Sequence, residues 1–312
     1  MRFTLESLQA IPQEIRERIR FLVETASANG STISLNELRL LMPENRFSTD
    51  NVLKDFLDVD ERLSGLLTET QGEITVRGRE DLVEARKSQR RLARARIVQA
   101  DEFLHTLSRI CPWIELAGIS GSTAYAGSKP EDDIDFFLVA KKRRVWISLL
   151  LAMVIARLER LRSSNPPMYC FNRIVERSNC ERTFRESREP LLAREVLNLV
   201  VLRGSRLYGR LLTSAPWIES MFPRLFAARL GEAGSTDDEP RDKAHSVGTI
   251  ANAVAFLVLG PYLLLAGMVR NVRLRKSGRD RECFNTLIQP DRYATESLLY
   301  NELRSEYREV FA

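Results

Sequence analysis

Two aspartates separated by one residue, Asp133 and Asp135, constrain this chain more than any other feature of its sequence. An apolar run at 136–139 follows them and predicts a β-strand, on which residues two apart point to the same face. Gly121 and Ser122 come shortly before, with ten residues between Ser122 and Asp133. Carboxylates on one face suit hard cations such as Mg²⁺, and a Gly-Ser pair lets backbone and hydroxyl approach a phosphate. The pattern therefore predicts a metal and phosphate site at the start of a strand.

The arrangement resembles the DNA polymerase β-like nucleotidyltransferase superfamily, whose signature is Gly-Ser or Gly-Gly followed at this spacing by Asp-x-Asp on a strand. The match falls on Gly121, Ser122, Asp133 and Asp135, while Asp132 precedes it and is expected in a turn. The resemblance implies a mixed α+β fold and Mg²⁺- or Mn²⁺-dependent transfer of a nucleotidyl group from an NTP to an acceptor hydroxyl. It also implies that the two aspartates coordinate the metal ions and that Gly121 and Ser122 hold the phosphates. A surface hairpin with an acidic turn is the alternative interpretation.

One position departs from the superfamily pattern. Many members carry a third carboxylate on the strand that follows the next helix, but here Asn172 occupies the middle of that strand and Glu176 its end. Parity along a strand places Asn172 and Glu176 on one face, so either could be a third metal ligand. Either could equally be an ordinary strand or surface residue. A second function therefore stays open, that of a nucleotide-binding interaction protein with weak catalysis.

The order of segments is similar to a group of bacterial and archaeal proteins labelled only as nucleotidyltransferase-domain proteins. The shared features include the arginine-rich helix, the Gly-Ser…Asp-x-Asp core, the Tyr-Cys-Phe-Asn strand at 169–172 and the Ala-Arg-Glu-Val segment at 193–196. We expect four parts: a winged-helix-like domain at 1–80, a basic connecting helix at 81–112, a nucleotidyltransferase core at 113–180 and a helical C-terminal region at 181–312.

The expected winged-helix-like domain consists of three short helices and a terminal hairpin. Its third helix, at about 49–61, is acidic rather than basic, so reading DNA through it would neutralise few phosphates. A role in docking a protein or in scaffolding is at least as well supported.

The connecting helix is rich in arginine. Arg86, Arg90 and Arg94 recur at helical spacing and predict one basic face. That face could be a solvated surface whose arginine stems cover apolar area, or a track that binds RNA or another polyanion.

A second long segment, at 247–269, is almost wholly apolar and is followed by Arg270, Arg273, Arg275 and Lys276. It is long enough to span a bilayer, which takes roughly 20 residues. A full span would place the basic flank on the other side of the membrane from an NTP-using domain, against the positive-inside tendency. In addition, Gly260-Pro261 should break a straight helix. We therefore expect a buried helical hairpin, with peripheral membrane contact as the alternative. The helix at 145–162 is apolar nearly all round and is expected to be buried.

Composition sets the remaining limits. The 312 residues are 44% hydrophobic and 29% charged, which excludes a disordered chain, and the net charge of +5 favours anionic partners such as nucleotides. The four cysteines form no C-x-x-C pair and are expected to be free thiols. The first twenty residues lack an apolar core of signal-peptide length, so we expect a cytoplasmic protein, which is membrane-associated if 247–269 contacts lipid.

Overall fold

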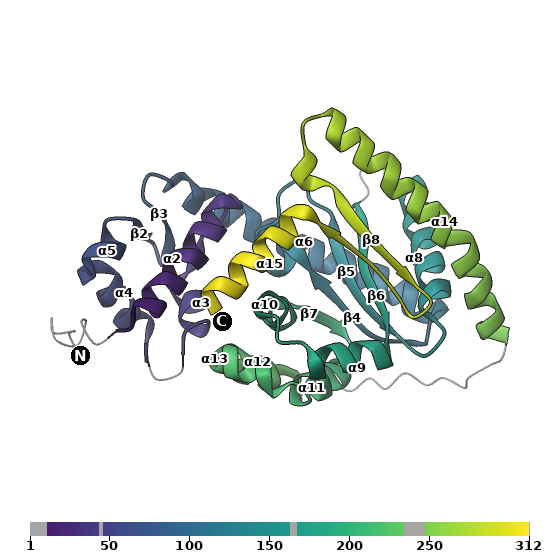
Figure 1. Ribbon diagram of the computed structural model, residues 1–312, viewed down its shortest axis with the longest axis horizontal. Helices are drawn as coiled ribbons and strands as arrows, with labels where there is room; N and C mark the ends of the chain where they lie inside the picture. Colours follow the sequence, from purple (N-terminus) through teal and green to yellow (C-terminus); the bar gives the residue numbers. More distant parts are fainter. Residues whose placement is uncertain (1–10, 44–45, 163–166, 234–246, 312) are drawn as a thin grey trace.

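A six-stranded mixed sheet forms the centre of the molecule (Figure 1). The computed structural model describes residues 11–43, 46–162, 167–233 and 247–311. The strand order is β7-β4-β5-β6-β9-β8. The strands are β4 (Ile114–Ser120), β5 (Ile134–Ala140), β6 (Tyr169–Glu176), β7 (Val200–Arg203), β8 (Phe284–Gln289) and β9 (Arg292–Ser297). β5 and β6 pair in parallel through the crossover helix α8 (Val145–Arg162), and the other pairs are antiparallel. The expected α+β class with a mixed sheet is confirmed.

Helices cover both faces of this sheet, because successive side chains of its strands point alternately into two apolar clusters. Phe136 of β5 packs with Phe103 of α6 (Asp81–Ile110) and with Trp146 of α8 in one cluster. Phe137, the next residue, packs on the opposite cluster beside Val196. That second face is covered by α9 (Arg177–Glu186), α10 (Pro190–Asn198), α11 (Ser205–Thr213), α12 (Pro216–Met221) and α13 (Pro223–Ala233). The alternation of strand side chains thus sets the layer order.

The N-terminal part consists of short helices and a three-stranded antiparallel sheet of order β1-β3-β2. Its elements are α2 (Gln13–Ala28), β1 (Ile33–Ser34), α3 (Leu35–Leu40), α4 (Asp50–Val59), α5 (Glu61–Ser64), β2 (Leu67–Thr70) and β3 (Glu73–Val76). Ser34 and Glu37 form a reciprocal capping box that starts α3, as their spacing predicts.

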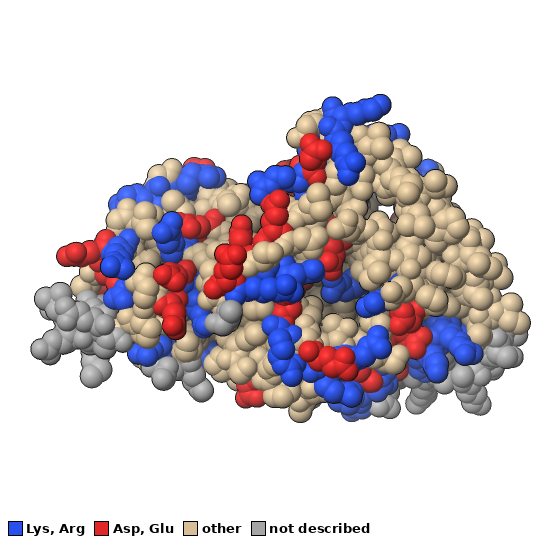
Figure 2. All heavy atoms as spheres, viewed as in Figure 1, with Lys and Arg blue, Asp and Glu red and all other residues tan. Residues whose placement is uncertain are grey.

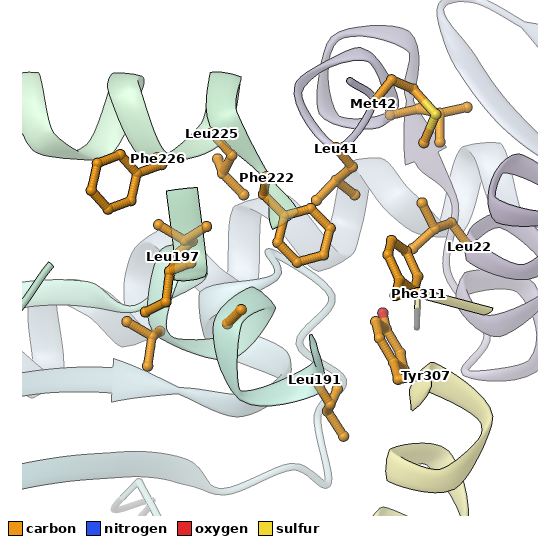
Figure 3. Close-up of a cluster of buried hydrophobic side chains, with 14 of the residues drawn as sticks. Leu22, Leu41, Met42, Leu191, Leu197, Phe222, Leu225, Phe226, Tyr307 and Phe311 are labelled. Carbon is orange, nitrogen blue, oxygen red and sulfur yellow. The ribbon is translucent and has the colours of Figure 1, made fainter. Parts of the chain in front are cut away.

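This N-terminal part shares its core with the end of the chain. Helix α15 (Leu298–Phe311) reaches from the central sheet to α2, where the rings of Phe21 and Tyr307 meet edge-on with centroids 5.0 Å apart. Figure 3 shows Leu22, Phe222 and Phe311 converging from the three regions. Arg224 of α13 also donates to the backbone carbonyl of Phe47. One continuous apolar cluster therefore joins residues 11–76 to the C-terminal helices.

The C-terminal region is not wholly helical, and that expectation was wrong. β7, β8 and β9 come from it and complete the central sheet on both sides. β8 and β9 are only six residues long, and neither alternates polar and apolar residues regularly, so hydrophobic periodicity does not reveal them.

The apolar segment at 247–269 forms neither a hairpin nor buried core. It belongs to one helix, α14 (Val247–Lys276), which continues through Pro261. Only 22% of its most apolar window is buried, and by length and composition it is the one described helix that could cross a membrane. Helix α8, which packs beside it, also exposes Val154, Leu158 and Leu161. The expectation that both helices are buried was therefore wrong, because each helix keeps one side over which no described element packs.

Candidate active site

Asp135 lies between two neighbouring strands at the start of β5. Ser120, the last residue of β4, is its partner on one side, and Cys170 of β6 is its partner on the other. Asp133 precedes it by two residues, at the point where β5 enters the sheet. Asp132 accepts a hydrogen bond from the backbone N–H of Lys129 at 2.9 Å, which confirms its expected place in a turn.

Gly121 makes direct contact with Asp135. Its φ of +65° lies in the left-handed region that side chains disfavour, and a Cβ at this position would stand 2.2 Å from Asp135 Oδ2. Gly121 and Ser122 open the four-residue helix α7 (Gly121–Ala124) immediately after β4. The structure thus brings Gly121 and Asp135 together, with Ser122 next in the chain, and glycine is required at 121 by both backbone conformation and space.

Asn172 holds the other side of Asp135. Its Nδ2 donates to Asp135 Oδ1 at 2.5 Å, while its own Oδ1 accepts from Cys170 Sγ at 2.8 Å and from Thr295 Oγ1 at 3.4 Å. Asn172 therefore lies where a third ligand was expected, but it presents an amide donor to the aspartate.

The two aspartates share an environment that opposes their negative charge. Burial, and then the charge of Asp133, raises the pKa of Asp135 to about 7, against the opposing effect of the Asn172 hydrogen bond. Burial also raises the pKa of Asp133, which Arg270 and Arg96 lower in part. One carboxylate oxygen of Asp133, Oδ1, is buried without a hydrogen-bond partner.

Glu176 is not part of this arrangement. It pairs with Ala140 at the far end of β5, five residues beyond Asp135, or about 16 Å at 3.3 Å per residue. Both its oxygens are engaged, by the backbone N–H of Arg143 at 3.0 Å and by Ser178 Oγ at 2.9 Å. The pairing of β5 with β6 also shifts register beyond Asp135, so strand parity does not carry from Asn172 to Glu176. The expectation that Glu176 might be a third ligand was wrong for this reason.

Two cavities border the carboxylate pair. One of about 290 Å³ is lined by Asp133 together with Met153 and Arg160 of α8 and Leu263 of α14. The other, of about 220 Å³, is lined by Gly121 and Asn172 on the sheet side and by helices α10 and α15 on the other. A larger hollow between α11 and α13 contains none of the candidate residues.

The second cavity contains an acid that the sequence motifs do not identify. Glu195 of α10 lines it and accepts a hydrogen bond from Tyr300 Oη at 2.7 Å. Burial raises the pKa of Glu195, while Arg173 and the Tyr300 hydrogen bond oppose that rise. Arg173 lines the same cavity and pairs with Glu296 at 2.6 Å. Glu195 lies 60 residues beyond Asp135, and no motif spacing in the sequence links the two.

The two aspartates fit a divalent cation in chemical type. Asp133 offers a buried oxygen without a hydrogen-bond partner, and the negative charge of Asp135 is disfavoured unless a cation lies nearby. Within residues 11–43, 46–162, 167–233 and 247–311, no three His, Cys, Asp or Glu residues gather into a metal-binding group. The described protein ligands would therefore be two carboxylates, with phosphate and water left to complete the shell.

The arginine-rich helix α6 does not present one basic face. Arg86 is buried and donates to Ser31 Oγ, to the Tyr125 carbonyl and to Glu37. Arg90 pairs with Glu73 at 2.6 Å, and only Arg94 of the three is fully exposed. The expectation of a joint polyanion track through Arg86, Arg90 and Arg94 was wrong, and so was that of a simple solvated face.

Comparison with known proteins does not place the chain in a family. No family model matches it, and neither a curated protein nor a solved structure matches at a significant level.

Proposed function

We propose that the protein is a metal-dependent nucleotidyltransferase that moves a nucleotidyl group from an NTP to an acceptor hydroxyl. The observation that carries this proposal is the contact between Gly121 and Asp135. These two residues, 14 positions apart in the sequence, meet so closely that a single Cβ would not fit between them. A phosphate held by the Gly121-Ser122 backbone would therefore lie beside the carboxylates.

Each residue has a separate task in this proposal. Asp133 and Asp135 hold Mg²⁺ or Mn²⁺, and the bound ions would neutralise charge on the transferring phosphate. Gly121 and Ser122 bind and orient the β- and γ-phosphates through backbone and hydroxyl donors. Asn172 fixes the orientation of Asp135 through its 2.5 Å hydrogen bond. The reaction is then driven by positioning and electrostatic stabilisation.

Glu195 is the proposed general base. It lines the same cavity as Gly121 and Asn172, and burial raises its pKa, which makes its ionised form a stronger base. The acceptor hydroxyl would enter this cavity, give its proton to Glu195 and attack the α-phosphate, with pyrophosphate as the leaving group.

The N-terminal part is proposed to be a winged-helix-like scaffold. Helix α4 carries Asp50, Asp55 and Asp58 and a single basic residue, Lys54, which pairs with Glu69. Its shared core with α13 and α15 supports a role in holding the molecule together rather than in reading DNA. Use of NTPs places the proposed catalytic part in the cytoplasm.

A second function is supported by Asn172. An amide that donates to Asp135 stands where a third carboxylate would add charge for the metal. The protein could then bind nucleotide as an interaction module without turning it over, and the same experiment separates the two functions.

The experiment compares Asp133→Asn and Asp135→Asn with the matched control Asp132→Asn, an adjacent acid that serves the turn. Purified proteins are incubated with each labelled NTP, Mg²⁺ or Mn²⁺, and cell extract, and both NTP binding and label transfer are measured. We expect both site variants to lose transfer by about a thousandfold, as for removal of an essential charge-stabilising group, and the control to keep it. Label transfer at the wild-type level in either site variant would contradict the proposed enzymatic mechanism. Metal-dependent NTP binding without transfer in the wild type supports the interaction module.

A further inference from the structure

The outward face of α14 is the most apolar surface that the structure describes. Six large side chains along it are between 54 and 70% exposed: Ile250, Val254, Leu257, Val258, Leu265 and Met268. No charged residue occurs from 248 to 269. In Figure 2 an unbroken uncharged surface covers this helix, with basic side chains gathered at one end. A helix on the surface of a soluble domain normally turns its polar face outward, so this face requires a partner.

The inward face of α14 is fixed to the domain along its length. Asn252 Oδ1 accepts from the backbone N–H groups of Trp146 at 2.8 Å and Ile147 at 3.2 Å. Near the other end, Asn271 exchanges two hydrogen bonds of 2.9 Å with the backbone of Phe284. A spanning helix would have to release these groups into hydrocarbon, where unsatisfied polar groups are costly. The helix can therefore meet a partner on one side only.

The charges that flank this face are mostly basic, and the acids Asp280 and Glu282 follow only beyond residue 279. Residues 141–162 and 248–279 together contain twelve Lys or Arg and one acid, Glu159. They lie at both ends of α14. Exposed Lys142 and Arg143 come just before Arg144, a buried residue that borders Gly248, and Arg273, Arg275 and Lys276 follow the apolar stretch. A second copy of the chain would bring these clusters together in either helix orientation, and like charges oppose that contact.

We propose that the outward face of α14 docks on an anionic lipid bilayer, with the helix lying in the plane of the interface. The apolar side chains enter the acyl boundary, and the basic ends contact lipid phosphates. This inference does not depend on the proposed catalytic function, because it rests on the exposure and charge of α14 alone.

The docked orientation would hold the carboxylate site near the lipid surface. Leu263 of α14 lines the same cavity as Asp133, and Arg270 and Arg160 are close enough to act on the charge of Asp133.

The test uses the full chain and sedimentation with vesicles. Wild-type protein is mixed with vesicles of phosphatidylcholine alone or of phosphatidylcholine and phosphatidylglycerol in equal parts, at low and high salt. One variant, Leu257→Glu with Leu265→Glu, changes the apolar face. A second, Arg273→Glu with Arg275→Glu and Lys276→Glu, changes the basic end. Val59→Glu with Val98→Glu is the matched control, since both valines are about half exposed elsewhere. Thermal melts confirm that each variant is folded.

We expect the wild type to bind the anionic vesicles and to release at high salt, and each α14 variant to bind about tenfold or more weakly while the control is unchanged. Three results would overturn the proposal. The first is no vesicle binding by the wild type. The second is a lipid-free dimer that the Leu257→Glu, Leu265→Glu variant dissociates, which identifies a second copy. The third is protein in cell membranes that resists alkaline carbonate extraction, which shows a span.

Discussion

Helices α6 and α14 are both 30 residues long, and the protein uses them in opposite ways. α6 is rich in charge, yet Arg86 and Arg96 are buried in contacts with other parts of the chain. α14 is apolar, yet most of its large side chains face outward. The polarity of a helix therefore does not determine its exposure. A buried arginine can find hydrogen-bond partners in neighbouring elements, and a leucine stays exposed where no element packs over it.

Each of the two helices contributes an arginine whose charge acts on the carboxylate pair. Arg96 of α6 and Arg270 of α14 both lower the pKa of Asp133, and Asp133 in turn raises that of Asp135. Four predictions sharpen or break this comparison.

The largest expected effect is the pH dependence that Asp135 gives to stability. Its pKa is about 7 in the folded protein, against an ordinary value of 3.8 when unfolded. Between these values the folded state keeps a proton that the unfolded state loses, so stability falls as pH rises from about 4 to 7. In the absence of divalent cations, the free energy of unfolding of Asp135→Asn should therefore rise relative to that of the wild type as pH increases. The difference should reach about 4 kcal/mol above pH 7.

Urea unfolding of both proteins at several pH values measures this difference. Millimolar Mg²⁺ should reduce it at high pH if the carboxylates bind the ion. A difference that does not change with pH contradicts the assignment of a disfavoured charge at Asp135.

The next effect concerns the buried basic residue of α6. Arg86→Ala should lower the free energy of unfolding by about 2 kcal/mol, because Ser31, Glu37 and the Tyr125 carbonyl lose a hydrogen-bond donor that is itself buried. Arg94→Ala, on the same helix but exposed, should change it by less than about 0.5 kcal/mol. Equal effects in chemical denaturation would show that α6 is a solvated helix after all.

A smaller loss is expected at the inward face of α14. Asn252 accepts from the first backbone N–H groups of α8, a task that a helix N-cap usually performs. Asn252→Ala should cost about 1–2 kcal/mol by thermal or urea unfolding. Asn252→Asp keeps an acceptor oxygen and should restore most of the loss; no recovery would assign the effect to packing.

The smallest effect is expected on the outward face of α14. Leu257→Ser with Leu265→Ser should change the stability of the protein without lipid by no more than about 0.5 kcal/mol, since both side chains are already exposed. A loss of 2 kcal/mol or more in urea unfolding would show that this face is covered in solution, which breaks the contrast with α6.

The candidate site shows how far sequence reasoning reaches. Gly121, Asp133 and Asp135 belong to one short segment, so a strand, a turn and a second strand bring them together without help from the rest of the chain. Glu195 and Tyr300 reach the same region from helices far along the sequence, and no local pattern predicts that meeting. Strand parity predicts that Asn172 and Glu176 lie on the same face, but the register of β6 against β5 shifts between them, and sequence alone does not reveal that shift.

The sequence by itself determined the Gly-Ser and Asp-x-Asp arrangement and the helices α6 and α8, because these depend on periodicity and on neighbouring residues. The α+β class followed from the family resemblance, and the unbroken helix α14 was not expected. Only the tertiary structure decided which faces of those helices are covered. Arg86 is buried because Glu37 and Ser31 lie opposite it, and Leu257 is exposed because α8 and the sheet occupy only the other side of α14. Burial depends on what lies across from a residue, and residues distant in sequence supply that neighbour.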